Sequence, residues 1–171
     1  MEVVKAPDPR LRVKTKPVKK INSGLIQIIK DMVKLTKTFT DPQGVGLAST
    51  QVGLDGTFFV AKKGTKFIPV MNPKILSTGK RTKKYFEGCL SIPNMWGEVK
   101  RFLQIRVSYQ DLTGKTITKP LTGILAWIFQ HEIDHLNGML FSDRVLEQKG
   151  KFYKFTGKDK TGTDTFEEVT I

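Results

Sequence analysis

The chain has 171 residues, of which 39% are hydrophobic and 26% are charged, and these values are typical of one soluble globular domain. No apolar run approaches the roughly 20 residues of a membrane-spanning helix, and the single cysteine excludes an internal disulfide. The net charge of +13 favours polyanions such as RNA, although scattered lysines are also typical of an ordinary solvated surface.

The N-terminal part of the chain shows no targeting segment. Residues 1–5 lack both the apolar core of a signal peptide and the composition of a transit peptide. We therefore expect a cytoplasmic protein, or an organellar matrix protein if a transit peptide was removed.

Three prolines in residues 6–18 predict an extended segment laid over the core. Apolar residues then recur at helical spacing from Ile21 to Phe39, which predicts an amphipathic helix.

Residues 44–51 read Gly-Val-Gly-Leu-Ala-Ser-Thr-Gln. Small residues suit a backbone that passes close to another group, and Gln51 offers an amide donor. An ordinary turn is the simpler interpretation of this stretch. The third glycine of a dinucleotide-binding loop is missing, which excludes that cofactor.

Strands dominate the middle of the chain. Asn72-Pro73 is expected to end the second predicted strand, at residues 66–71, and a turn is expected at residues 111–114. A last hairpin is predicted from residues 151–155 and 165–171. The strands predicted before the central helix are 57–62, 66–71, 98–102, 104–109 and 115–119. This pattern predicts the α+β class, with antiparallel strands around a central buried helix.

That helix is predicted at residues 122–137, with Thr122 as its N-cap and Gly138 at the C′ position. It carries the only two histidines of the chain, in a His-Glu-x-x-His sequence at residues 131–135. Histidines four residues apart lie on one helix face, so both can bind one metal ion, and Glu132 can reach a water on that ion. A histidine pair hydrogen-bonded in a core is the alternative, which the ligand spacing around a glutamate disfavours.

Two histidines leave a metal ion short of ligands. A third histidine six residues downstream is a common solution, but Phe141 occupies that position and no other histidine exists. Glu147, Glu167 and Glu168 follow, but the sequence there does not predict a helix that would present one of them. Cys89 is the remaining candidate, and a Cys/His/His set with water at the fourth position is a sound catalytic site.

Three motifs together resemble the peptide deformylase family, in its first, bacterial-type class. They occupy residues 44–51, 87–91 and 130–135, with further matches at 7–12 and 72–73. Their order and spacing are those of the family, and the resemblance covers about residues 3–146. It implies a single peptide-deformylase-like domain at residues 1–171, with 147–171 as a variable C-terminal tail.

The resemblance implies a metal-dependent hydrolase that removes the N-formyl group from the formyl-methionine of nascent polypeptides. The implied metal ligands are Cys89, His131 and His135. Glu132 is the implied general base and then acid, while Gln51 and the backbone N–H of Leu90 stabilise the oxyanion. The implied substrate-binding residues are Val45, Gly46, Gly88, Tyr85, Ile124, Trp127 and Ile128, of which the last four are expected to line the pocket for the methionine side chain. Glu87 and Arg101 correspond to a pair that steadies the cysteine loop.

The family also indicates the cofactor and the partners. Fe²⁺ is the expected ion, and Zn²⁺, Ni²⁺ or Co²⁺ are expected substitutes. The expected partners are nascent formyl-methionyl peptides and, through the basic charge, the ribosome surface. We expect a monomer that binds no membrane and no specific nucleic-acid sequence. Ser49 and Phe102 stand where the family frequently has alanine and proline, and Trp96 is a bulky residue in a loop that usually varies. These differences bear on substrate preference rather than on the chemistry.

Two other functions stay open. One is a peptidase of the His-Glu-x-x-His type, against which the missing third histidine and the Cys89 motif argue. The other is a basic, ribosome- or RNA-associated binding protein without activity. The intact set of Gln51, Cys89, Glu132 and both histidines argues against that loss.

Overall fold

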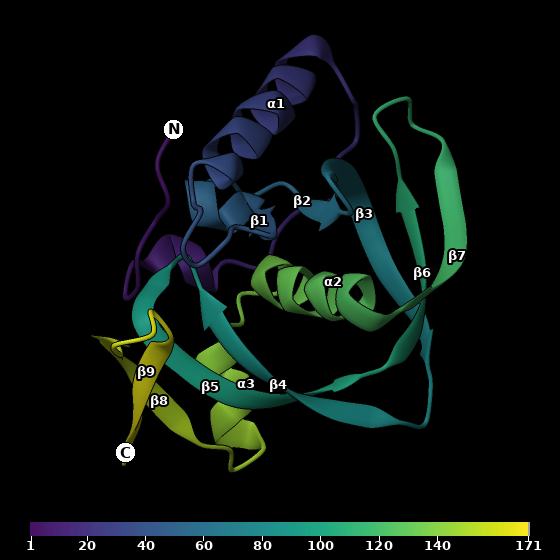
Figure 1. Ribbon diagram of the computed structural model, residues 1–171. Helices are drawn as coiled ribbons and strands as arrows, with labels where there is room; N and C mark the ends of the chain where they lie inside the picture. The colour runs from purple at the N-terminus through teal and green to yellow at the C-terminus, as the bar shows by residue number, and fades with distance from the viewer. Residues whose placement is uncertain (171) are drawn as a thin grey trace.

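The computed structural model describes residues 1–170 (Figure 1). Antiparallel strands form two sheets, and helix α2 (Gly123–Leu136) lies between them and contacts both. The predicted α+β class with a central helix is therefore confirmed. Within residues 1–170, no helix has the length and apolar character needed to cross a membrane.

The nine strands form a five-stranded sheet and a four-stranded sheet. The first sheet has the order β1-β2-β3-β6-β7 and the second the order β4-β5-β8-β9. The strands of the first sheet are β1 (Gly46–Ala48), β2 (Phe58–Lys63), β3 (Lys66–Thr78), β6 (Gln104–Gln110) and β7 (Thr116–Thr122). Those of the second are β4 (Thr82–Cys89), β5 (Ile92–Phe102), β8 (Phe152–Lys158) and β9 (Asp164–Val169). The other helical elements are η1 (Pro9–Arg12), α1 (Ser23–Lys37), η2 (Ser49–Val52) and α3 (Phe141–Glu147).

Strand β2 is buried on both faces because the first sheet is covered by a helix on each side. Successive side chains of a strand point to opposite faces. Phe58 and Val60 pack in the cluster that contains Met32 of α1. Phe59 points the other way and meets Phe129 of α2 edge-on, with 5.0 Å between ring centroids. This double burial holds α2 in the interior of the molecule, where its polar residues are shielded from water.

Both long helices begin and end close to their predicted limits. Helix α1 starts after Asn22, whose side-chain oxygen accepts from the backbone N–H of Leu25 at 2.9 Å. Helix α2 follows Thr122, although the Thr122 side chain makes no capping hydrogen bond. Gly138 has φ +74°, and a Cβ at this position would lie 2.6 Å from the carbonyl oxygen of Arg12. The left-handed conformation and the close approach both require glycine.

The predicted end of the second strand at Asn72-Pro73 is wrong. Strand β3 continues to Thr78, and only its register with β6 shifts between Met71 and Lys74. Asn72 adopts φ +49°, and its amide nitrogen donates to the carbonyl of Val18 and to the side chain of Gln110. The asparagine and proline therefore form a bulge that the side-chain hydrogen bonds satisfy, rather than a turn.

Strand β4 and helix α3 were not expected from the sequence. In β4 the fully buried side chain is Glu87, so the strand lacks the apolar alternation by which strands are predicted. No helix that would present Glu147 to a metal ion was expected after Gly138. A helix does form there, because α3 packs Phe141 and Val145 against Val99 of β5, but its Glu147 pairs with Arg144. The last hairpin is confirmed as β8 and β9, while position 171 of its predicted range lies outside the described residues.

Candidate active site

Cys89, His131 and His135 place one potential metal-ligand atom each within 4.8 Å of one another. The histidines are one turn apart on α2, and Cys89 ends β4. The sulfur of Cys89 lies 3.3 Å from Nε2 of His135. One thiolate and two imidazoles in this arrangement fit a single divalent ion with room for a further ligand.

Glu132 stands beside these donors with a carboxylate oxygen that has no protein partner. Among the described residues, its Oε2 and Nδ1 of His135 are the buried side-chain polar atoms without a hydrogen bond. Burial raises the pKa of Glu132 to about 7. A Cβ on Gly46 would lie 2.4 Å from Oε1 of Glu132, so the glycine is what allows the carboxylate this close to β1. The site thus holds a carboxyl group that is free to exchange a proton.

Gln51 points its amide nitrogen at the cysteine. Its oxygen accepts from the backbone N–H of Ala48 at 3.0 Å, which fixes the orientation of the amide. Its nitrogen lies 3.4 Å from the sulfur of Cys89 and 3.1 Å from the hydroxyl of Ser91. A buried donor held this way can stabilise negative charge on an oxygen next to the metal donors.

A buried carboxylate, Glu87, orients one of the histidines. It accepts from Arg101 at 2.7 and 3.0 Å, from Nε1 of Trp127 at 2.8 Å and pairs with Nδ1 of His131 at 2.9 Å. Burial raises the pKa of Glu87, but the hydrogen bonds with Arg101 and His131 outweigh it and hold the pKa well below its usual range. An ionised carboxylate only accepts, so Nδ1 of His131 carries the proton and Nε2 keeps its lone pair for a metal.

The ionic network continues from Glu87 to helix α3. Arg101 also donates to Asp134 at 2.6 Å, and Asp134 accepts from Arg144 at 2.7 and 3.0 Å. The sequence analysis did not identify Asp134 or Arg144. An aspartate inside an apolar helix is a signal that a buried cation lies nearby, whereas Arg144 carried no signal because α3 itself was not expected.

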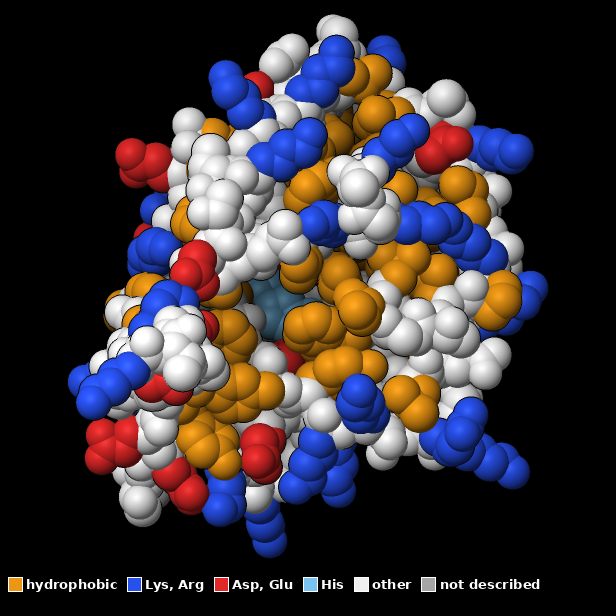
Figure 2. Space-filling model, viewed as in Figure 1, with side chains coloured by type: hydrophobic (Ala, Val, Ile, Leu, Met, Phe, Trp, Pro, Cys, Tyr) orange, Lys and Arg blue, Asp and Glu red, His pale blue; other side chains and the backbone are white. Residues whose placement is uncertain are grey.

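A cavity of about 540 Å³ leads to the metal donors. Val45 and Gly46 line one side, and Gly88, Cys89 and Leu90 line another. Strands β1 and β4 are at the edges of their sheets, so the cavity lies between two open strand edges. Figure 2 shows a histidine at the floor of this hollow and hydrophobic side chains around its rim.

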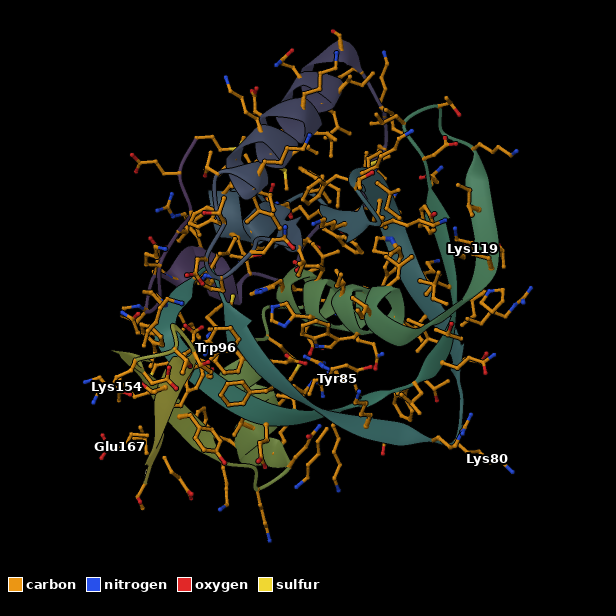
Figure 3. The ribbon with its side chains drawn as sticks, viewed as in Figure 1. Lys80, Tyr85, Trp96, Lys119, Lys154 and Glu167 are labelled. Carbon is orange, nitrogen blue, oxygen red and sulfur yellow. The ribbon has the colours of Figure 1, made fainter. Side chains whose placement is uncertain are left out.

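The four side chains expected to hold a methionine do not all reach this cavity. Trp127 and Ile128 line it, but Tyr85 and Ile124 do not. Tyr85, which is labelled beside α2 in Figure 3, instead stacks on Trp127, with ring centroids 5.0 Å apart and planes 1° from parallel. Ile124 is 67% exposed, because the first turn of α2 extends beyond the cavity. Tyr85 therefore supports the lining from outside, and Ile124 takes no part in it.

The cavity also includes residues that the sequence analysis did not identify. Phe155, Lys158 and Asp164 of the C-terminal hairpin line it, as does Asp41 from the loop after α1. The tail is rich in lysine, threonine and aspartate, a composition typical of any exposed loop. No local signal connected it with the metal donors.

Comparisons with known proteins agree on one family. A family model for polypeptide deformylase matches residues 1–151. A peptide deformylase of Heliobacterium modesticaldum is 45% identical over 145 residues, which cover 84% of this chain and 93% of that protein. The crystal structure of peptide deformylase from Thermotoga maritima is similar with a TM-score of 0.79 and 40% identity, covering 84% of this chain and 95% of that one. A Met-Ala-Ser-bound class I type b peptide deformylase from Acinetobacter baumannii has a TM-score of 0.78 and 29% identity, covering 84% and 97%. The chain therefore belongs to the polypeptide deformylase family, the enzymes that remove the N-formyl group from nascent peptides.

Proposed function

We propose that this chain removes the formyl group in the cavity between β1 and β4, and that Cys89, His131 and His135 hold one divalent metal ion there. The observation that carries the proposal is the convergence of three ligand atoms within 4.8 Å beside a buried carboxylate. When bound, the ion supplies Lewis acidity, which activates water at neutral pH and stabilises charge on the formyl oxygen. We propose Fe²⁺ as the native ion and Zn²⁺, Ni²⁺ or Co²⁺ as substitutes, because thiolate and imidazole ligands suit all four.

Glu132 is the proposed proton carrier. It takes a proton from the attacking water and passes it to the departing amine, because an amine leaves only when it is protonated. Its Oε2 has no protein partner, so no existing hydrogen bond has to be broken for this transfer. The close approach of Gly46 keeps the carboxylate next to the metal donors.

Gln51 and the backbone N–H of Leu90 are the proposed donors to the oxyanion. Attack on the formyl carbon places negative charge on its oxygen, and loss of one preset donor typically lowers the rate by about 10²–10³-fold. The amide of Gln51 is held by Ala48, so it needs little reorganisation when the charge develops.

The substrate backbone is proposed to bind as an added strand. Val45, Gly46 and Gly88 lie at the open edges of β1 and β4 or next to them, where an extended peptide can pair with the main chain. Trp127 and Ile128 offer an apolar surface for the unbranched side chain of methionine, whose sulfur makes favourable contacts with aromatic rings.

The test is anaerobic hydrolysis of formyl-Met-Ala-Ser by Fe²⁺-loaded protein, beside Glu132→Gln and Cys89→Ala. Turnover by the wild type that is lost in Glu132→Gln at unchanged metal content supports the role of Glu132. Loss of metal from Cys89→Ala supports its role as a ligand. A folded, Fe²⁺-loaded wild type without turnover would refute the proposal. Loading with Zn²⁺, Ni²⁺ and Co²⁺ ranks the substitutes in the same assay.

We further propose that residues 1–171 act as one domain and as a monomer in the cytoplasm, where nascent chains emerge. The monomer is supported by a site whose metal ligands, base and oxyanion donors all come from one chain. The charge of +13 supports contact with the ribosome surface. Cosedimentation with ribosomes at low salt that weakens steeply at high salt tests this contact, and binding that ignores salt contradicts it.

A further inference from the structure

The C-terminal hairpin β8–β9 lies beyond the family match, which ends at residue 151, yet it reaches the candidate active site. Strand β8 extends the second sheet by pairing with residues 95–97 of β5. Phe155 and Lys158 of β8 and Asp164 of β9 line the same cavity as the metal donors. In Figure 1 the hairpin, in yellow, stands beside the ends of β4 and β5.

An aromatic cluster fixes the hairpin to the cavity wall. We define this cluster by its members Phe86, Trp96, Tyr153, Phe155 and Phe166. Phe86 stacks on Trp96 at 5.3 Å, and Phe166 meets these two rings at 4.9 and 5.7 Å. Phe155 contacts Phe166 at 5.9 Å. Trp96 and Phe155 are also cavity residues, so one side of the cluster is part of the binding surface. Aromatic pairs stabilise a contact beyond the area that they bury, so the cluster holds the hairpin against β4 and β5.

Lys158 connects the hairpin to the opposite wall. Its ammonium lies 3.1 Å from the carboxylate of Asp41, in the cavity-lining loop that precedes Gly44, and it also pairs with the carboxylate of Asp164 in β9. The Lys158 side chain is 45% exposed and that of Asp41 is 63% exposed. Both ion pairs of Lys158 are at least one-third exposed and contribute little to stability, so the ammonium can donate to a bound ligand while it keeps one of its two carboxylate partners.

The route of the substrate leads toward these residues. The metal donors mark the place of the formyl group, and Trp127 and Ile128 that of the methionine side chain. The next residues run along the open edges of β1 and β4, advancing about 3.3 Å per residue. Neither formyl hydrolysis nor the methionine pocket uses Phe155 or Lys158.

We infer that the hairpin is a third wall of the peptide cleft and binds the second and third residues of the nascent chain. The ring of Phe155, with that of Trp96, packs on an apolar second side chain, and Lys158 donates to a peptide carbonyl. This inference rests on the proposed function. It assigns a substrate contact to the part of the chain outside the family match.

The test compares formyl-Met-Leu-Ser with formyl-methioninamide, which ends at the methionine. In Phe155→Ala and Lys158→Ala, the ratio of kcat/KM for the tripeptide to that for the amide is expected to fall about 5- to 10-fold through KM, the size of one lost polar or apolar contact. Lys154→Ala is the control for Lys158, since Lys154 is an exposed lysine of β8 outside the lining (Figure 3). Tyr153→Ala is the control for Phe155, because Tyr153 belongs to the aromatic cluster through Phe86 alone and does not line the cavity.

Both controls are expected to keep the wild-type ratio. A Tyr153→Ala ratio that falls as far as that of Phe155→Ala would overturn the inference, since the packing of the aromatic cluster, and not contact of Phe155 with the substrate, would then explain the loss. Equal effects of Phe155→Ala and Lys158→Ala on both substrates, or none, would also overturn it. Failure of the wild type on both substrates would instead refute the proposed function.

Discussion

Replacement of Arg101 by methionine tests the buried ionic network behind the metal donors. Arg101 is 4% exposed and donates to Glu87 at 2.7 and 3.0 Å and to Asp134 at 2.6 Å. Methionine fills most of the volume, so the main loss is electrostatic. Removing one partner of a buried ion pair costs about 3–5 kcal/mol, because the other charge stays behind without its partner. Asp134 keeps Arg144, and Glu87 keeps Trp127 and His131, so we expect the lower end, about 3 kcal/mol.

Urea unfolding of Zn²⁺-loaded protein, monitored by tryptophan fluorescence, measures this free energy. Arg144→Met is the matched control, since Arg144 is 33% exposed and water can replace part of its contribution. We expect it to cost about 1 kcal/mol. The double variant Arg101→Met with Glu87→Gln is expected to be more stable than the sum of the single effects, because both charges leave together. A loss below about 1 kcal/mol for Arg101→Met, or strict additivity in the double variant, would refute the reasoning.

Three further changes probe the site itself. Gly46→Ala would place a Cβ 2.4 Å from Oε1 of Glu132, so we expect kcat for formyl-Met-Ala-Ser to fall about 100-fold. The control is Gly24→Ala, in the first turn of α1, which we expect to keep wild-type activity. Glu87→Gln removes the charge that fixes the proton on Nδ1 of His131, and chelator competition is expected to show about 10- to 100-fold weaker metal binding. In metal-free protein, burial raises the pKa of Glu132 to about 7, so its neutral form stabilises the fold at low pH and this contribution is lost as pH rises from 4.5 through about 7. Relative to Glu132→Gln, the free energy of unfolding of the wild type should therefore fall by about 3 kcal/mol across that range, as measured by urea titration in the presence of chelator.

Specific results would contradict these expectations. Wild-type kcat in Gly46→Ala would show that the glutamate needs no glycine beside it. Unchanged metal affinity in Glu87→Gln would mean that the ring of His131 is oriented by its helix alone. Parallel pH curves for the wild type and Glu132→Gln would show that the carboxyl has an ordinary pKa when the metal is removed.

Sequence analysis identified those site residues that belong to a local sequence pattern. The spacing of His131 and His135 follows from one turn of helix, and their position in α2 agrees with it. Cys89 was reached by elimination and by the family motifs. The family resemblance assigned Tyr85 and Ile124 to the substrate-binding residues, but in the structure Tyr85 stacks behind Trp127 and Ile124 lies on the exposed first turn of α2.

Long-range contacts explain most of what the sequence did not reveal. The pairing of Glu87 with Arg101 was indicated by the family resemblance and not by a local pattern, and the burial of Glu87 depends on its distant partners Arg101, Trp127 and His131. Asn72-Pro73 has the composition of a turn, but contacts with Val18 and Gln110 convert it into a bulge. Phe155 and Lys158 reach the cavity only because β8 pairs with β5, which no local pattern indicates.

The two open strand edges that border the cavity bear on how broadly such an enzyme can act. Main-chain N–H and C=O groups are the same in every peptide, so a cleft that grips the backbone is indifferent to most of the side chains it receives. Selection then falls on the first residue alone, which every newly started chain shares. One enzyme can in this way act on nascent chains of many different sequences. Side-chain contacts further along the cleft then change only the rate at which each chain is processed.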